Sequence, residues 1–395
     1  MATQSQISSD ILKPPATQVG VVGWLRRNLF STWYNALLTL LALYVIYLIT
    51  KSIFDFVTTA NWGVVTNNLS LFMVGRYPAD QVWRVKTSVS IFVFLIGASW
   101  AMWRGVAQSV AILLAAIFTA AAILPFATND RLWMAGNLAL VGVGFSVGYF
   151  TRARRVLVSA WLLSLPVIAI LLYGVGALPQ VSTNLWGGLL LTLALALVSS
   201  VASFPLGVLL AVGRQSTYPA LRAFCVGYIE LIRGVPLITV IFMMQIMLPL
   251  FLPSEITVER VMRAMAGFTI FTAAYIAEVV RGGLQAIPRG QIEAAHALGL
   301  NSILTLLLII LPQALRITIP ALMGQFISLF KDTSLVAIVG LLDLAGIATA
   351  AANQPEFLGR QAEVYVFIAL IYFVFAYGIS HSSRRLERSL GVGER

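Results

Sequence analysis

Cysteine, histidine and charged residues are all scarce in this chain of 395 residues. The single cysteine, Cys225, excludes an internal disulfide framework and a cysteine cluster around a metal. The two histidines, His296 and His381, cannot supply a metal site with several imidazole ligands. No Gly-x-x-x-x-Gly-Lys-Ser/Thr segment occurs, so the phosphate-binding loop of many ATPases is missing. The sequence therefore predicts that this chain binds no metal or cofactor and is not itself an enzyme.

Charged residues make up only 10% of the chain, whereas 59% is hydrophobic and the mean hydropathy is +0.90. A soluble domain carries roughly 25% charged residues, so this chain cannot cover a surface that faces water. The composition predicts an integral membrane protein. The net charge of +11 has a simple origin in such a protein, because lysine and arginine accumulate in cytoplasmic loops. It therefore does not indicate a nucleic-acid partner.

An all-α membrane fold with about ten transmembrane helices is predicted, because a helix needs about 20 apolar residues to cross a bilayer. The candidate spans are 33–54, 87–103, 106–126, 132–150, 156–174, 185–213, 235–252, 262–281, 303–330 and 364–381. The ninth contains Pro312 and Pro320 and is expected to be a broken helix. A polar outer loop is expected at about 55–85.

The distribution of basic residues orients these spans. With a cytoplasmic N-terminus, 16 of the 26 lysines and arginines lie inside, nine lie outside and Arg316 lies within a span. The three arginines at 152, 154 and 155, just beyond a span end, discriminate best between the two orientations. We therefore expect both termini in the cytoplasm.

Ionisable residues at membrane depth are concentrated in the second half of the chain, after a break at about 175–185. They are Glu230, Arg233, Glu278, Arg281, Arg316, Lys331 and Asp332. Such groups are costly in a membrane and are therefore functional candidates by default. The five earlier spans carry almost no internal charge, which predicts a scaffold or assembly role for them.

One motif stands out between the eighth and ninth spans, at residues 290–312. Glu293, Ala294 and Ala295 are followed by Gly299 and then by Ile309, Leu311 and Pro312. This pattern resembles the EAA loop of ABC importer permeases, in which the loop forms a short cytoplasmic coupling helix. Glycine at 299 suits a helix end, since it accepts a left-handed conformation. The resemblance implies that Gly290 and these seven residues couple the chain to a separate ATPase, which binds the ATP and magnesium.

A second segment, Glu-Leu-Ile-Arg-Gly-Val-Pro-Leu-Ile at 230–238, resembles an element of the polar amino-acid subgroup of these permeases, with Val235 in place of a common threonine. Glu230 and Arg233 are three residues apart and can pair on one helical face. Gly234 and Pro236 are expected to break or bend the helix. A hinge and clamp at the cytoplasmic mouth is one interpretation; the other is that Arg233 simply extends its charge to the interface.

A third segment, at 312–335, also resembles that subgroup and contains adjacent Lys331 and Asp332 followed by Thr333 and Ser334. These groups could bind the ammonium and carboxylate of an amino acid, or Lys331 and Asp332 could only neutralise each other. Glu278 could likewise take part in the substrate path, or it could only form an internal ion pair with Arg281. The predicted substrate path comprises Tyr275, Glu278, Gln325, Lys331, Asp332, Thr333 and Ser334.

The resemblance covers about 185–381 and implies a type I ABC importer core of five helices. We divide the chain into a cytoplasmic tail at 1–32, an additional five-helix block at 33–180, the core at 181–383 and a basic cytoplasmic tail at 384–395. The long form resembles permeases of general L-amino-acid uptake in the bacterial inner membrane. The implied partners are a second permease subunit, two copies of a cytoplasmic ATPase and a periplasmic amino-acid-binding protein.

Two other classes of membrane protein remain as alternatives. A secondary amino-acid transporter or channel would use an ion gradient and no ATPase, and the EAA loop counts against it. A membrane-embedded enzyme would need a nucleophile or metal cluster, which the histidine and cysteine counts do not supply.

Overall fold

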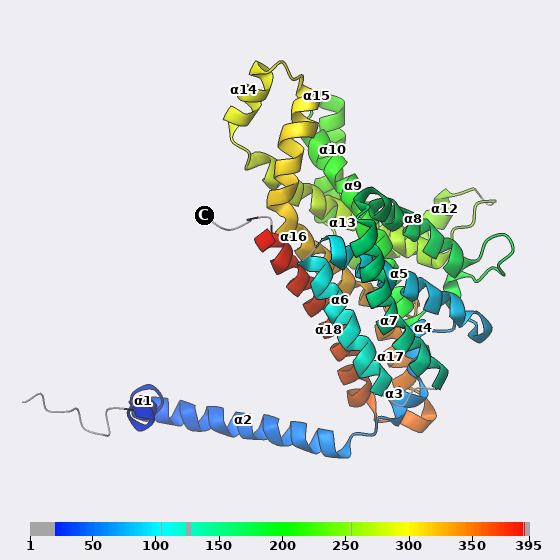
Figure 1. The fold of residues 1–395 in the computed structure, drawn as a ribbon. Helices are drawn as coiled ribbons and strands as arrows, with labels where there is room; N and C mark the ends of the chain where they lie inside the picture. The colour runs from blue at the N-terminus through cyan, green and yellow to red at the C-terminus, as the bar shows by residue number, and fades with distance from the viewer. Residues whose placement is uncertain (1–19, 104, 124–127, 254, 390, 392–395) are drawn as a thin grey trace, which may run out of the picture. The chain divides into compact units, whose positions relative to one another are not determined.

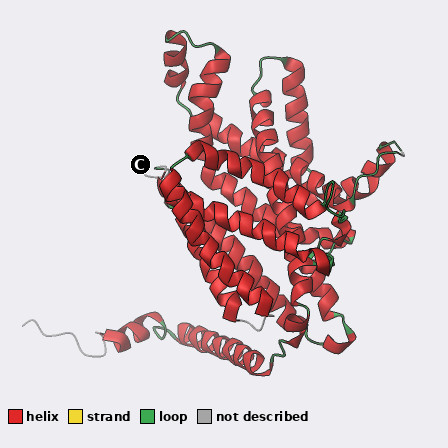
Figure 2. Ribbon diagram, turned by 45° about the vertical axis from the view of Figure 1, so that its right-hand side comes forward, coloured by secondary structure: helices red, strands yellow, loops and turns green. Residues whose placement is uncertain are grey.

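A computed structural model describes residues 20–103, 105–123, 128–253, 255–389 and 391. Helices joined by loops make up this part of the chain (Figure 2), and its β-structure is limited to isolated bridges. The all-α prediction is confirmed. The chain forms two compact units, Met1–Asn61 and Trp62–Arg395, which we describe separately.

The first unit contains two helices, α1 (Gly20–Asn28) and α2 (Trp33–Thr59). Thr32 caps α2 by accepting a hydrogen bond from the Asn35 amide. None of the 27 residues of α2 is buried within the chain. A water-soluble helix would bury one face, so a helix that is apolar and exposed all round fits a lipid environment. This helix confirms the first predicted span.

The second unit (Figure 1) contains the remaining helices. Those before the predicted core are α3 (Gly63–Asn67), α4 (Leu69–Val74), η1 (Ala79–Gln81), α5 (Val82–Met102), α6 (Val106–Ile123), α7 (Thr128–Thr151) and α8 (Arg154–Tyr173). Those that follow are η2 (Thr183–Leu185), α9 (Gly188–Arg214), α10 (Pro219–Arg233), α11 (Leu237–Phe242), η3 (Met243–Met247), α12 (Leu248–Phe251), α13 (Arg260–Gln285), α14 (Arg289–Ala297), α15 (Ser302–Leu304), η4 (Thr305–Ile310), α16 (Leu311–Asp332), η5 (Thr333–Val339), α17 (Leu344–Ala352), η6 (Pro355–Phe357) and α18 (Gln361–Ser389).

The number of membrane-crossing helices agrees with the prediction. Nine helices in the described residues are long and apolar enough to span a bilayer, and a bent pair makes ten. The pair consists of Pro219–Arg233 and Leu237–Phe251, with a bend of 107° between them. The bend falls at Gly234 and Pro236, where the sequence predicts one. The seventh span is thus the second arm of a bent element, with a π-helical segment, η3, inside it.

The ninth span is not broken, which corrects the sequence-based prediction. Residues Ser302–Val339 continue as one helical segment through both prolines. Pro312 has no N–H to donate, and its ring would clash with the carbonyl four residues earlier. The π-helical segment η4 lies at that point and widens the helix locally, and Pro320 lies inside α16.

Helix α13 is the centre of the core, packing against α9, α10, α11 and α16. Small residues permit this close packing, as they do between many membrane helices. A Cβ at Gly207 of α9 would lie 2.5 Å from the Cγ2 of Ile276, and one at Gly283 would lie 2.4 Å from the Cγ2 of Thr318. A larger residue at either position would therefore clash with the neighbouring helix.

The segment at 63–81, within the outer loop that the sequence predicts, contains short helices and packs into the second unit. Val64 and Phe72 are fully buried in a cluster with Leu344 and Ile347 of α17. The Phe72 ring meets that of Phe367 edge to face at 5.2 Å. Helices α3 and α17 lie at the end of this unit opposite α14 (Figure 1). Hydrophobic contacts thus connect the predicted N-terminal block with the predicted core, across the boundary at 180/181. The division of the chain into these two domains stays a prediction.

Candidate functional site

Helix α14 projects at one end of the second unit (Figure 1) and packs against the π-helical segment η4. Pro288 is its N-cap, one position before the first helical residue. Gly290, Glu293 and Ala294 are exposed, whereas Ala295 is the helix's one buried residue. The helix therefore packs against η4, buries Ala295 and leaves most of its other residues exposed.

The end of α14 is a Schellman motif. The Leu300 amide donates to the Ala295 carbonyl at 3.1 Å, and the Gly299 amide donates to the His296 carbonyl at 2.9 Å. Gly299 has a φ of 80°, the left-handed conformation that the sequence predicts. Leu298, just before it, is 83% exposed. The turn thus holds an apolar side chain outward, exposed at the end of α14.

The other three residues of the motif lie in the next helical segment. Ile309 belongs to η4 and is half-buried, as is Leu311 at the start of α16. Leu311 packs against a core cluster that includes Ala277 and Val280 of α13. Ile309 thus belongs to the segment against which α14 packs, whereas Leu311 packs against α13 and Pro312 is exposed.

A cluster of charged side chains lies near the C-terminal ends of α9, α10 and α13, with Glu278 at its centre. The Glu278 carboxylate is 3.3 Å from Nη1 of Arg214 and 3.4 Å from Nη1 of Arg233. It also accepts hydrogen bonds from Arg281, of which the bond from Nε measures 3.0 Å. Because the three arginines come from three helices, this carboxylate joins α9 and α10 to the helix that leads into α14.

The predicted pair between Glu230 and Arg233 is wrong. Glu230 lies 3.0 Å from Nη2 of Arg214 instead. Arg233 turns to Glu278 and lies 5.7 Å above the ring of Tyr275. Since α9 brings a third cation to the site, the two residues find better partners on neighbouring helices than on their own. The predicted pair of Glu278 with Arg281 is confirmed, as one arm of a larger cluster.

The predicted substrate-path residues fall into two separate groups. Tyr275 and Glu278 belong to the charged cluster, whereas Lys331 to Ser334 lie at the far end of α16. The hydrogen bonds and ion pairs of the described residues do not join the two groups to each other. Gln325 is half-buried within α16. The structure therefore does not bring all these residues to one site.

At that far end, the hydroxyls of Thr333 and Ser334 donate to the carbonyls of Phe330 and Lys331. Such local bonds use donors that a cargo carboxylate would otherwise take. Lys331 is exposed, and the described ion pairs do not join it to Asp332. No direct ion pair is thus formed, although the charge of Lys331 still acts on Asp332, and recognition of cargo by these residues stays a prediction.

Comparison with known proteins identifies the family. Residues 203–391 match the family described as "Binding-protein-dependent transport system inner membrane component". The chain is 37% identical to the inner membrane amino-acid ABC transporter permease protein YhdY of Escherichia coli K12, over 94% of this chain and 93% of that protein. The chain belongs to the amino-acid ABC transporter permeases. This permease is thus a multi-pass protein of the inner membrane.

Two further relatives describe the range of similarity. The glutamate/glutamine/aspartate/asparagine transport system permease protein BztC of Rhodobacter capsulatus is 35% identical over 99% of both chains. The likeness therefore includes the additional N-terminal spans. A crystal structure of an amino acid ABC transporter with histidines is 30% identical, covers 51% of this permease and 92% of its own chain, and has a TM-score of 0.46.

Sequence reasoning missed Arg214 as a member of the charged cluster. It is the last residue of α9 and resembles any basic residue at a span end. It also missed Asp343, which is fully buried, caps α17 through the amides of Ala345 and Gly346 and accepts a hydrogen bond from Tyr372. Burial raises the pKa of Asp343 above its ordinary value, although these hydrogen bonds oppose the rise. A carboxylate before an apolar helix was the available signal.

Proposed function

We propose that this permease forms part of the pathway by which polar amino acids enter the cell, driven by a separate ATPase that docks on α14. The observation that carries the proposal is the exposed face of α14, held by the Schellman turn at Gly299 and supported on η4. The permease BztC, similar over its whole length, is named for glutamate, glutamine, aspartate and asparagine. This name supports polar cargo.

The proposed complex contains a second permease subunit, two copies of the ATPase and a periplasmic amino-acid-binding protein. ATP and magnesium bind to the ATPase. In this permease, movement of α14 passes to α13 through the short connection at 286–288. The Glu278 cluster then transfers the movement to α9 and α10, because its arginines come from those helices. Two conformations of the core, each favoured by a different partner, would make this a coupled switch.

Transport by the purified complex tests the proposal. We expect proteoliposomes that contain this permease, its second permease subunit, the ATPase and the binding protein to accumulate labelled glutamate, glutamine, aspartate or asparagine when ATP is enclosed with the ATPase. Uptake should cease with a non-hydrolysable ATP analogue. Uptake that needs an ion gradient and ignores ATP would instead support a secondary transporter.

The proposed orientation places both termini and α14 in the cytoplasm and α3 outside. In a Cys225→Ala background, an impermeant thiol reagent added to intact cells should label Thr66→Cys, which is exposed at the α3 end. It should not label Glu293→Cys until the cells are permeabilised. Labelling of Glu293→Cys in intact cells would reverse the orientation. Arg384→Cys, in the basic C-terminal segment, is a second cytoplasmic control.

A further inference from the structure

A cavity of about 520 Å³ lies between the C-terminal ends of α5 and α7 and the starts of α6 and α8. Its lining includes Trp100, Gln108, Phe145, Tyr149, Arg152 and Arg154. Pockets for small ligands occupy roughly 300–1,000 Å³, so the space is sufficient for one. The residues that line the cavity are distant in sequence from the charged cluster. They belong to the additional N-terminal spans, which take no part in the transport mechanism proposed above.

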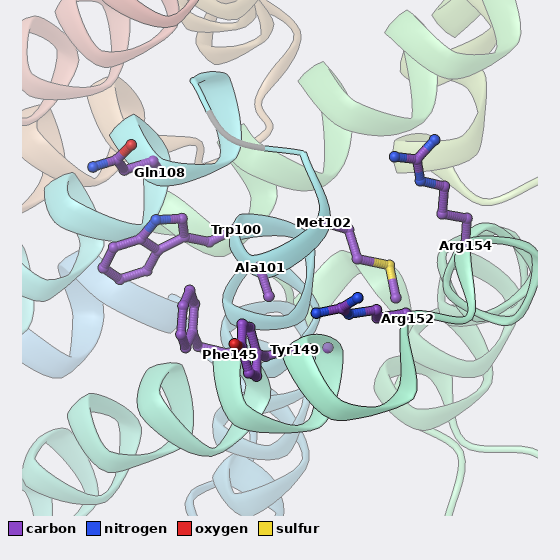
Figure 3. A pocket seen from close by; sticks show the side chains of 9 residues that line it. Trp100, Ala101, Met102, Gln108, Phe145, Tyr149, Arg152 and Arg154 are labelled. Atoms are coloured by element: carbon purple, nitrogen blue, oxygen red, sulfur yellow. The ribbon is translucent and has the colours of Figure 1, made fainter.

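Aromatic rings form one wall of this cavity (Figure 3). The Trp100 and Phe145 rings are 5.0 Å apart, and Phe145 stacks on Tyr149 at 6.3 Å. The guanidinium of Arg152 lies 5.6 Å above the Tyr149 ring. A cation in this position is held by the ring's negative face, while its N–H groups stay free to bind an anion.

The arginines at this end of the spans have no acidic counterpart in the part of the chain that the structure describes. Arg152, Arg154 and Arg155 are exposed and close together in the chain, and no ion pair of the described residues includes any of them. Three like charges within four residues repel one another. A bound anion would remove that repulsion.

The backbone at Arg152 gives an independent indication. Its φ is 47°, and it is the one non-glycine residue of the described chain with a positive φ. Glycine adopts this conformation without steric cost, whereas arginine does not. Strain of this kind occurs at ligand-binding positions, where the side chain is needed at a particular place. Here it directs a guanidinium to the edge of the cavity.

The surroundings of the cavity favour a lipid over a soluble anion. Phe150, beside Tyr149, is 81% exposed, and Val156, beside Arg155, is 67% exposed. Apolar side chains next to these arginines at a span end match a phosphate group with acyl chains attached. The fork of a guanidinium fits phosphate oxygens, and basic pockets between membrane helices bind anionic headgroups. We propose that this cavity binds the headgroup of an anionic phospholipid.

Lipid titration of the full-length permease tests this proposal without relying on transport. In detergent micelles at physiological salt, we expect dioleoyl phosphatidylglycerol to raise the thermal midpoint saturably and dioleoyl phosphatidylcholine to have no such effect. Native mass spectrometry should show retained phosphatidylglycerol. Inorganic phosphate is added in a third titration. A rise in the thermal midpoint with phosphate equal to that with the lipid would overturn the lipid assignment.

Two variants and a matched control locate the site. Arg152→Gly removes the guanidinium and suits the backbone, and Arg154→Gln removes the second lining charge. Each should weaken the apparent affinity for phosphatidylglycerol about tenfold, since each loses charge-assisted hydrogen bonds. Arg155→Gln removes the same charge from the neighbouring residue, which does not line the cavity, and should change the affinity by less than about twofold. Equal loss in all three variants, or no preference for phosphatidylglycerol in the unaltered protein, would overturn the proposal.

Discussion

Replacing Glu278 with glutamine should uncouple ATP hydrolysis from uptake, lowering amino acid transported per ATP on the order of tenfold. Glutamine has nearly the same shape but removes the negative charge that three arginines share. Coupling between two sites is typically worth about 1–3 kcal/mol, which corresponds to about 5- to 150-fold. The Glu278 side chain is only 23% exposed, so water replaces the lost interactions incompletely. The measurement is uptake and phosphate release in the same proteoliposomes.

Glu230→Gln is the matched control for this experiment. Glu230 contacts one arginine, Arg214, and its side chain is 56% exposed. An exposed ion pair contributes about 0–1 kcal/mol, so we expect coupling to change by less than about threefold. If Glu278→Gln transports as well per ATP as the unaltered permease, the cluster does not transmit movement of α14. If both variants lose coupling equally, net charge matters and the particular contacts do not.

Gly299→Val should abolish most uptake while leaving the permease inserted and assembled with its second permease subunit. The φ of 80° at Gly299 is unfavourable for a β-branched residue by about 1–2 kcal/mol or more. No atom lies within 4 Å of a Cβ placed there, so the damage comes from the backbone and not from a clash. Unwinding the turn would displace Leu298 and disturb the face of α14 on which we propose that the ATPase docks. Uptake and the amount of ATPase that co-purifies with the complex measure the effect.

Replacing Gly282 with valine distinguishes the effect of the positive φ at Gly299 from a general effect of introducing valine. Gly282 is exposed within α13, would have no atom within 4 Å of an added Cβ and lacks a positive φ. Valine is slightly better than glycine inside a helix, so Gly282→Val should transport normally. Normal uptake by Gly299→Val, at normal expression, would contradict the assignment of α14 as the docking element.

Several features of the candidate site could be predicted from sequence because they depend on residues close together in the chain. The end of α14 needs a left-handed residue next to its last turn, and glycine at 299 supplies it. The bend at Gly234 and Pro236 is likewise local. The continuity of the ninth span was not predictable from its prolines, since a π-helical segment accommodates Pro312.

Sequence alone determined the membrane class, about ten spans and the position of the motif at 290–312, because hydropathy, chain length and motif spacing require no knowledge of tertiary contacts. Only the tertiary structure decided which charges meet. Glu230 is three residues from Arg233, yet it pairs with Arg214, whose helix packs alongside. It also decided that Phe72 enters the core beside Phe367. Such contacts depend on how helices rotate and cross, and the side chains at a crossing come from segments far apart in the chain.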